Sequence, residues 1–251
     1  MLSGVLTAGG WGLLAGSALL VGAFMGYVVR IPVGVVAAIM AFGSGVLLSA
    51  VSFELIAEAH ERAGIVPTTV GAVVGAGAYT GANVWLASRG ARHRKRSGDQ
   101  QPSESEQSGS GTAIALGALL DGIPESIVIG ASLLGGGPVS AVTVVAVFIS
   151  NVPEGLSSAS GMRRAGRSRA YVFGLWTAIA VVSAVAAMAG YALLGDASPA
   201  VLAAITALAG GAILCMIADT MIPEAFEDAH LWIGVITVVG FLTAFALSHL
   251  D

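Results

Sequence analysis

The chain has 251 residues, of which 56% are hydrophobic and only 10% are charged, and its formal net charge is -4. With a mean hydropathy of +0.87, it lacks the polar residues that cover the surface of a soluble domain. Its acidic balance also excludes a basic face for nucleic acid. We therefore expect a membrane protein with little room for a second, soluble domain.

Eight apolar runs follow one another along the chain, each about long enough to cross a bilayer as a helix. Strands of a membrane β-barrel would alternate polar and apolar residues over about ten positions, and these runs do not. The sequence predicts one all-α, polytopic membrane domain over residues 1–251, with eight transmembrane helices at 11–29, 33–57, 66–88, 113–134, 138–161, 170–194, 199–222 and 231–250.

Lys and Arg residues indicate the orientation of these spans. If the N-terminus lies outside, ten of the eleven basic residues fall in inner loops and only Arg62 lies outside. The C-terminus is then also outside, in a multi-pass protein of the cell membrane. The one long loop, residues 91–111, is polar and low in complexity, so we interpret it as a mobile cytoplasmic linker. Its charges are explained better as a topology signal than as a regulatory element.

The fourth and fifth spans carry acidic residues near the middle of the membrane. Asp121 and Glu125 are four residues apart on one helical face, and Asn151 and Glu154 occupy a similar depth on the next span. A buried carboxylate costs several kcal/mol unless it is paired, protonated or bound to a cation. Since no Lys or Arg lies in a span at that depth, we expect a metal ion at Asp121, Glu125, Asn151 and Glu154.

A proline precedes the glutamate in both spans, at Pro124 and Pro153. Each removes one helical hydrogen bond and frees the backbone oxygen four residues earlier, which a metal ion or an ordered water could satisfy. The alternative is a pair of kinked helices whose protonated acids share hydrogen bonds. Two such motifs in adjacent spans favour an ion pathway.

Further acids lie toward the ends of two other spans. Glu54 and Glu58 fall near the outer end of the second span, and Asp219 and Glu224 near the inner end of the seventh. They are candidates for the approach and exit of an ion, with Asp219 placed deepest, although solvated span ends explain them equally well. Met216, Met221 and Cys215 are interpreted as packing residues rather than soft ligands.

Two internal similarities indicate an inverted repeat. Residues 121–126 (DGIPES) resemble 150–155 (SNVPEG), and residues 45–59 (GVLLSAVSFELIAEA) resemble 211–225 (GAILCMIADTMIPEA). In each pair the two segments fall in spans that run in opposite directions. Spans one to three therefore mirror spans six to eight around a central pair, which predicts a 3+2+3 repeat with a substrate site at the repeat interface.

These motifs resemble those of the ZIP family of divalent metal ion transporters. The two Pro-Glu segments match the family's His-Asn-x-Pro-Glu-Gly-type motifs, and residues 53–59 and 219–225 are similar to its FELIPEA and DELIPEA segments. The resemblance implies a ZIP-like fold and metal transport into the cytoplasm. Asp121 and Ser150 stand where the family usually has histidines, Gly122 replaces an asparagine, and the sixth span lacks a glutamate that many relatives carry.

The ligand types indicate which ion is transported. Carboxylate, amide and carbonyl oxygens suit Mn²⁺ or Fe²⁺ as well as Zn²⁺, which the resemblance favours. The expected partners are thus this metal ion, as substrate, and the lipid bilayer, with a homodimer left open. A non-transporting metal-binding protein or sensor is the alternative. An enzyme is not expected, because HExxH, GxSxG and Cys/His pairs are missing from the spans.

Overall fold

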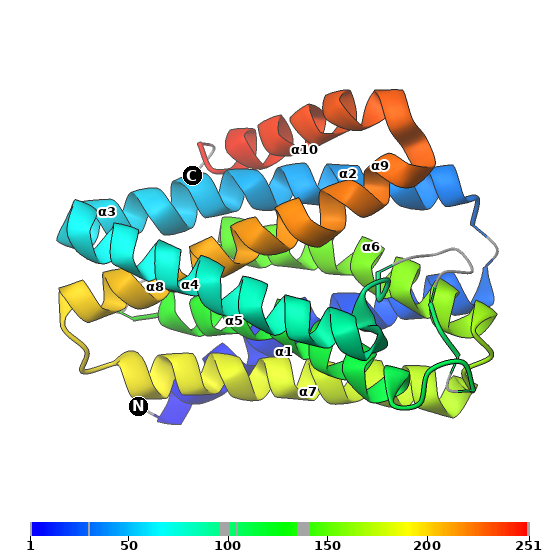
Figure 1. Cartoon of the computed structure of the whole chain (residues 1–251). Coiled ribbons are helices and arrows are strands. Elements are labelled where there is room, and N and C mark those ends of the chain that lie inside the picture. Colours follow the sequence, from blue (N-terminus) through cyan, green and yellow to red (C-terminus); the bar gives the residue numbers. More distant parts are fainter. Residues whose placement is uncertain (1, 30, 96–100, 104, 135–140, 250–251) are drawn as a thin grey trace.

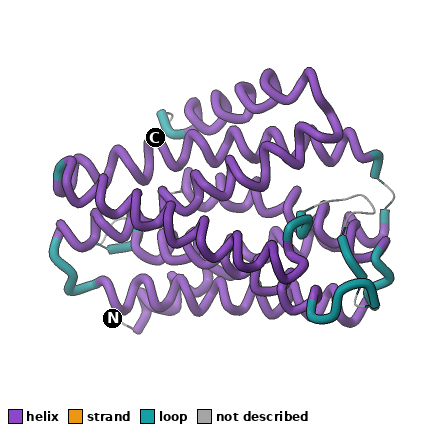
Figure 2. Tube along the Cα trace, viewed as in Figure 1, coloured by secondary structure: helices purple, strands orange, loops and turns teal. Residues whose placement is uncertain are grey.

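The computed structural model describes residues 2–29, 31–95, 101–103, 105–134 and 141–249. Within these ranges the chain is helical, without strands, and its long helices lie side by side in an elongated bundle (Figures 1 and 2). The predicted start of the fifth span at residue 138, the end of the eighth at 250, and residues 96–100 and 104 of the long loop lie outside the described residues.

The helices lie where the spans are predicted, but some are longer: the first begins at Leu2 rather than at residue 11, and the second and seventh continue to Ala63 and Ala229, beyond the predicted ends at 57 and 222. In chain order they are α1 (Leu2–Val28), α2 (Val33–Ala50), η1 (Val51–Ala57), α3 (Glu58–Ala63), α4 (Ile65–Leu86), η2 (Ala87–Ala91), α5 (Ser110–Ala131), α6 (Ala141–Arg164), α7 (Arg169–Leu194), α8 (Pro199–Met216), η3 (Ile217–Met221), α9 (Ile222–Ala229), η4 (His230–Trp232) and α10 (Ile233–Leu247).

Six helical stretches in the described residues are long and apolar enough to cross a membrane: Leu2–Val28, Val33–Ala63, Ile65–Ala91, Ser110–Ala131, Arg169–Leu194 and Pro199–Glu227. The helices α6 and α10 occupy the positions predicted for the fifth and eighth spans. At 15 residues, α10 is shorter than the roughly 20 residues that span a hydrocarbon core. The chain is accordingly an all-helical, multi-pass membrane protein.

The connections between helices gather at the two ends of the bundle. The loops after α1, η2, α6 and α9 lie at one end, and both chain termini lie toward the other (Figure 1). The end with these loops carries most of the basic residues, including four arginines between positions 163 and 169. The bundle is thus polarised in charge along its long axis.

Small residues bring particular helix pairs together. The closest neighbours are α1 with α6 and α7, α4 with α8, α2 with α10, and α5 with α7. A Cβ atom at Gly75 of α4 or Gly211 of α8 would overlap backbone of the opposite helix, and the same holds for Gly45 of α2 and Gly240 of α10. In lipid, where apolar surface alone does not drive association, such backbone contact stabilises helix pairs through dispersion.

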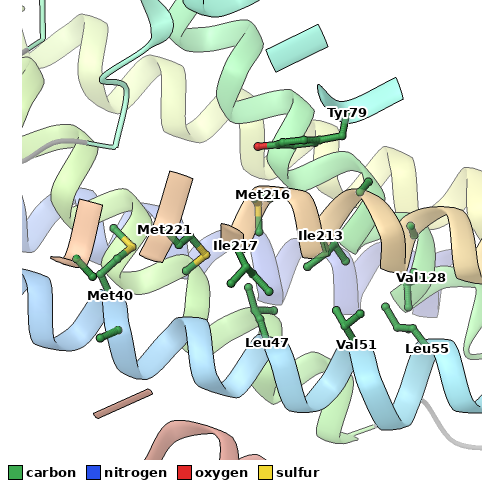
Figure 3. Packing of buried hydrophobic residues seen from close by; sticks show 14 of the residues in the cluster. Met40, Leu47, Val51, Leu55, Tyr79, Val128, Ile213, Met216, Ile217 and Met221 are labelled. Carbon is green, nitrogen blue, oxygen red and sulfur yellow. The ribbon is translucent and has the colours of Figure 1, made fainter. Parts of the chain in front are cut away.

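The largest apolar cluster lies between the second and seventh predicted spans. Leu47 and Val51 face Ile213 and Ile217 across it (Figure 3). The predicted packing role of two methionines and the cysteine is confirmed, because all three belong to this cluster or pack against it: Met216, Met221 and Cys215. Tyr79 adds its ring to the same cluster, while its hydroxyl reaches the polar site described below.

Both of the similar segments 45–59 and 211–225 contain a π-helical stretch. The stretches η1 and η3 each begin six residues after the glycine that opens the segment, Gly45 or Gly211. A π-helical turn is wider than an α-helical one and is found mostly at functional sites. The sequence similarity is therefore matched by an uncommon backbone feature at the same position.

Candidate cation site

The four residues predicted to bind a metal ion all lie inside the bundle. Asp121 and Glu125 are one turn apart on α5, and Asn151 and Glu154 are three residues apart on α6, with Pro124 and Pro153 inside the same helices. None of the four residues is more than 4% exposed. The two proline-containing helices thus bring three carboxyl groups and one amide into an interior that the bilayer would surround.

Asp121 is held by an arginine from the loop that follows η2. The guanidinium of Arg94 donates from Nε to Asp121 Oδ2 at 3.1 Å and from Nη2 to Oδ1 at 3.0 Å. Tyr79 also donates to Oδ1, at 2.7 Å, and Arg94 Nη1 donates to Asn83 at 2.8 Å. Such a bidentate, charge-assisted pair is among the stronger polar contacts in proteins.

The next residue, Lys95, joins the two helices. Its ammonium nitrogen lies 3.3 Å from Asp121 Oδ2 on α5 and 3.1 Å from Glu154 Oε2 on α6. Burial alone would lower the pKa of Lys95, but these two carboxylates outweigh burial and raise the pKa above its ordinary value. The pKa of Arg94 is raised in the same way, mainly by Asp121. Both side chains therefore carry a positive charge at neutral pH.

These ion pairs contradict the expectation from the sequence that no basic side chain neutralises the carboxylates. That expectation is wrong because the cations come from a loop rather than from a span. The chain reverses at Gly90, whose φ of 101° is in the left-handed region, and Arg94 and Lys95 turn back into the bundle. The signal available in the sequence was a glycine shortly before a basic run, RHRKR, directly after a span.

Part of the described long loop is packed against the bundle, around Arg94, Lys95 and Gln101, whereas Arg92 and Glu106 are exposed. Gln101 is buried and donates to the backbone oxygens of Arg94, at 3.0 Å, and of Ser158 on α6, at 3.1 Å. Ser157 donates to the backbone oxygen of Lys95. On α5, Gly117 makes room for Arg94, because a Cβ atom there would overlap the arginine side chain. Helix α5 is thus shaped to accept the loop.

Glu125 differs from Asp121 and Glu154 because its buried Oε1 atom has no hydrogen-bond partner among the described residues. Glu154, Lys95 and Asp121 all act on it electrostatically. A buried polar atom left unpaired is rare and costs about 1–3 kcal/mol, so it calls for an explanation such as an ion. Glu125 is the carboxylate most in need of a further cation.

Glu224 on α9 adds a fourth carboxyl group to this region. It is buried, and it acts electrostatically on both Arg94 and Lys95. Asp219, predicted as the deepest of the span-end acids, is instead exposed. Depth along a helix does not determine which way a side chain faces, and η3 directs this residue away from the interior.

The side chain of Asn151 contacts the neighbouring helix α1. Its amide nitrogen donates to the backbone oxygen of Ala15 on α1 at 3.1 Å, which leaves the amide oxygen as the atom that can ligate a metal. This hydrogen bond also joins α6 to α1, where small residues bring the two backbones together. Asn151 thus combines a structural contact with a potential ligand.

The carboxylates do not converge on one point in this conformation. Among the described residues, no three His, Cys, Asp or Glu side chains stand close enough to hold a metal ion together. Lys95 lies between Asp121 and Glu154 and occupies the position where their oxygens approach. An ion shared by α5 and α6 therefore requires that this ammonium group move away.

Glu54 and Glu58 lie at the opposite end of the bundle and line a cavity of about 20 Å³, roughly the space of one water molecule. Glu58 pairs with Arg62 one turn along the same helix. The cavity is also lined by Val128 of α5, one turn beyond Glu125, which is a rise of about 4.5 Å. A short step along α5 thus separates this cavity from the buried site.

No protein-family model matches this chain, and no curated protein matches it either. Chemically, the site combines hard oxygen donors with two cations in an enclosed, water-poor interior. Such an arrangement is suited to holding and exchanging positive charge.

Proposed function

We propose that the protein transports a divalent metal cation across the membrane into the cytoplasm, through a site formed by α5 and α6. The observation that carries this proposal is the unpaired, buried Oε1 atom of Glu125 beside two further carboxylates. A visiting cation would satisfy that oxygen, and Glu154 would share the ion. Asp121 and Asn151 would complete its coordination shell from the same two helices.

The charges of the buried cluster support a divalent ion. Four buried carboxyl groups, on Asp121, Glu125, Glu154 and Glu224, face the two cations Arg94 and Lys95. When all are ionised, the four carboxylates exceed these two cations by two charges, which equals the charge of one divalent cation. In a medium of low dielectric constant, such an imbalance attracts a counter-ion far more strongly than it would in water.

A pathway follows from the positions of the acidic residues. Glu54 and Glu58 would attract the ion at the end opposite the basic loops, and the small cavity beside Val128 leads toward Glu125. Glu224 lies on the loop side of the site, near Arg94 and Lys95, and would receive the ion on its way out. We place the termini outside and the loop end of the bundle in the cytoplasm, as the distribution of basic residues favours.

The 3+2+3 inverted repeat is part of the proposal. Its symmetry would exchange span three with eight and span seven with two, and the packing of α4 on α8 indeed has a counterpart in that of α10 on α2. It would likewise exchange the α1–α6 pair with the α7–α5 pair, and both pairs are in contact. The π-helical stretches η1 and η3 obey the same correspondence. Secondary transporters place their substrate sites at such repeat interfaces.

With this topology and its two Pro-Glu motifs, we propose a transporter of the ZIP type in which Asp121 and Ser150 stand at the positions of the usual histidines. The ligand set of this chain contains oxygen donors from Asp, Glu and Asn. Oxygen donors accept Mn²⁺ and Fe²⁺ readily, and carboxylates also bind Zn²⁺. We therefore expect the protein to transport Zn²⁺ and to accept Mn²⁺ or Fe²⁺ as well.

The test is metal uptake by liposomes that contain the purified protein. Replacing Glu125 or Glu154 by Gln removes one ligand charge with little change in volume, and we expect each change to lower the uptake of Zn²⁺ and Mn²⁺ at least tenfold. The matched control is Glu61→Gln, since Glu61 is an exposed acid on α3. Equal uptake by wild type and both site variants would contradict the proposal.

A second candidate is a membrane protein that binds metal without transporting it. The ion pairs of Arg94 and Lys95 favour this candidate, because they already compensate part of the buried charge. The two functions separate in one preparation. Bound metal without flux into liposomes identifies a sensor or a structural site, whereas flux that follows the metal gradient identifies a transporter.

A further inference from the structure

Lys95 occupies an unusual position for a loop residue. Its ammonium group lies within 3.3 Å of carboxylates on two different helices, and only 1% of the residue is exposed. Beyond those two ion pairs, the described residues supply no hydrogen-bond acceptor for this nitrogen. The group therefore contacts the surfaces that a bridging metal ion would contact, and little else.

Arg94 is held in a different way. Its guanidinium contacts Asp121, Tyr79 and Asn83 through separate nitrogens, and Gly117 leaves space for its side chain. Displacing Arg94 would break several hydrogen bonds of good geometry at once. Displacing Lys95 would break two ion pairs that an incoming cation could replace directly.

Side-chain hydrogen bonds attach the backbone that carries these two residues to the bundle. Gln101 and Ser157 hold it through hydrogen bonds to the backbone oxygens of Arg94 and Lys95. These acceptors belong to a turn rather than to a helix, so water can replace the bonds when the turn moves away. Helical hydrogen bonds of α5 and α6 are not affected by that movement.

From this geometry we infer that Lys95 is a tethered competitor of the transported ion, and that the ammonium group and the metal exclude each other from one position between Asp121 and Glu154. The inference rests on the proposed function. It assigns to Arg94 and Lys95 the control of the loop-side exit, which is closed while Lys95 is bound and opens when a divalent ion displaces it. Arg94 acts as the anchor about which the lysine moves.

Exchange of the two cations follows from charge. Lys95 brings one positive charge to a pair of carboxylates, whereas a divalent ion brings two and can also accept Glu125 as a ligand. Like charges in a poorly solvated interior repel strongly, so both cannot occupy the position together. A low metal concentration therefore favours the closed arrangement and a high one the open arrangement.

The experiment measures the binding of Mn²⁺ and Zn²⁺ to purified protein by calorimetry, for wild type, Lys95→Met and Arg92→Met. Methionine keeps the length of the lysine chain and removes its charge, and Arg92 is an exposed neighbour in the same turn. We expect Lys95→Met to bind metal at least tenfold more tightly than wild type, and Arg92→Met to bind as wild type does. Weaker or unchanged binding by Lys95→Met would overturn the inference.

A second measurement uses the wild-type chain, so it does not depend on the folding of a variant. Hydrogen exchange of the backbone amides of residues 91–95 is followed with and without Mn²⁺. Faster exchange in this turn after addition of metal is expected, because the ion releases it. A purely structural role of Lys95 predicts unchanged or slower exchange, and either result would count against competition.

Failure of this inference can be distinguished from failure of the proposed function. Binding that Glu154→Gln abolishes but Lys95→Met leaves unchanged would retain the metal site and reject the competitor. Absence of binding in wild type and in every variant would reject the metal site itself, and the competitor with it.

Discussion

Two similar segments of this chain place an equivalent glutamate in opposite environments. Glu58 and Glu224 each lie 13 residues after the glycine that opens segment 45–59 or 211–225. The side chain of Glu58 is 50% exposed and pairs with Arg62 of its own helix. Glu224 is buried and faces the loop cations Arg94 and Lys95. Related local sequence therefore does not determine how a charge is compensated.

The difference shows what the loop adds to the bundle. At the end near α3, an acid is satisfied by a neighbour one turn away, so the rest of the fold contributes little. At the other end, buried acids depend on side chains that arrive from a distant part of the sequence. The first arrangement tolerates substitution, whereas the second couples the loop to α5, α6 and α9. We therefore expect substitutions in the second arrangement to cost more stability.

The largest effect is expected from breaking the buried pair. Arg94→Leu leaves Asp121 without its main partner in the interior, and the loss of one member of a buried ion pair costs about 3–5 kcal/mol. Arg62→Leu breaks the equivalent exposed pair, for which about 0–1 kcal/mol is expected. Thermal unfolding of both variants in the same detergent measures the difference in lost stability. Similar stability of the two variants would show that the buried and the exposed ion pair do not differ as proposed.

A double variant separates the loss of the pair from the burial of an unpaired charge. In Arg94→Leu/Asp121→Leu both charges are removed, so the remaining cost is that of lost contacts alone. We expect the double variant to recover at least half of the stability that Arg94→Leu loses. A double variant as unstable as the single one would mean that packing around the arginine, rather than charge, is what matters.

The next largest effect is expected at the close backbone contacts of α2 with α10 and of α4 with α8, which the inverted repeat relates to each other. Gly45→Ala and Gly211→Ala, at the glycines that open the two similar segments, would each drive a methyl group into backbone of the opposite helix, at the α2–α10 and α4–α8 contacts. We expect about 1–3 kcal/mol of destabilisation from such overpacking. Gly34→Ala on α2 and Gly77→Ala on α4, two helices of the same contacts, meet open space and are expected to be neutral or slightly stabilising.

If the two contacts are equivalent, as an inverted repeat requires, both glycine variants should lower the unfolding temperature by similar amounts. A loss at one contact only would break the equivalence of the two halves. The measurement is again thermal unfolding, with the two open-space variants in parallel to remove the effect of helix propensity.

The sequence was sufficient to predict the helices because long apolar runs leave little alternative in a membrane. The span near residues 33–57, for example, is helical from Val33 to Ala63, and the residues predicted as metal ligands do lie in the interior. The number of helices follows from the hydrophobic pattern, and the approximate depth of these residues follows from that pattern and from the positions of Pro124 and Pro153. These features are local, so they can be read from neighbouring residues.

The neutralisation of the buried carboxylates by two cations from the loop could not be predicted in this way. Lys95 is 26 residues from Asp121 and 59 from Glu154 along the chain, and its approach depends on a reversal at one glycine and on space beside Gly117. A basic, low-complexity loop has the composition of a solvated segment. Only the three-dimensional arrangement distinguishes the two buried cations in it from the exposed Arg92.

The smallest effect is expected at the two glycines that reverse the chain, one near each of the compared regions. Gly90 precedes the loop cations with a φ of 101°, and Gly64 joins α3 to α4 with a φ of 80°. Replacement by Ala strains either turn by about 1–2 kcal/mol.

At Gly90 the strain is relieved when the loop leaves the bundle, so amide exchange of residues 91–95 should become about tenfold faster. Gly64→Ala should cost similar stability without changing exchange in that turn, because its turn carries no side chain into the site. Equal acceleration by both variants would show that the loop responds to global stability rather than to its own hinge.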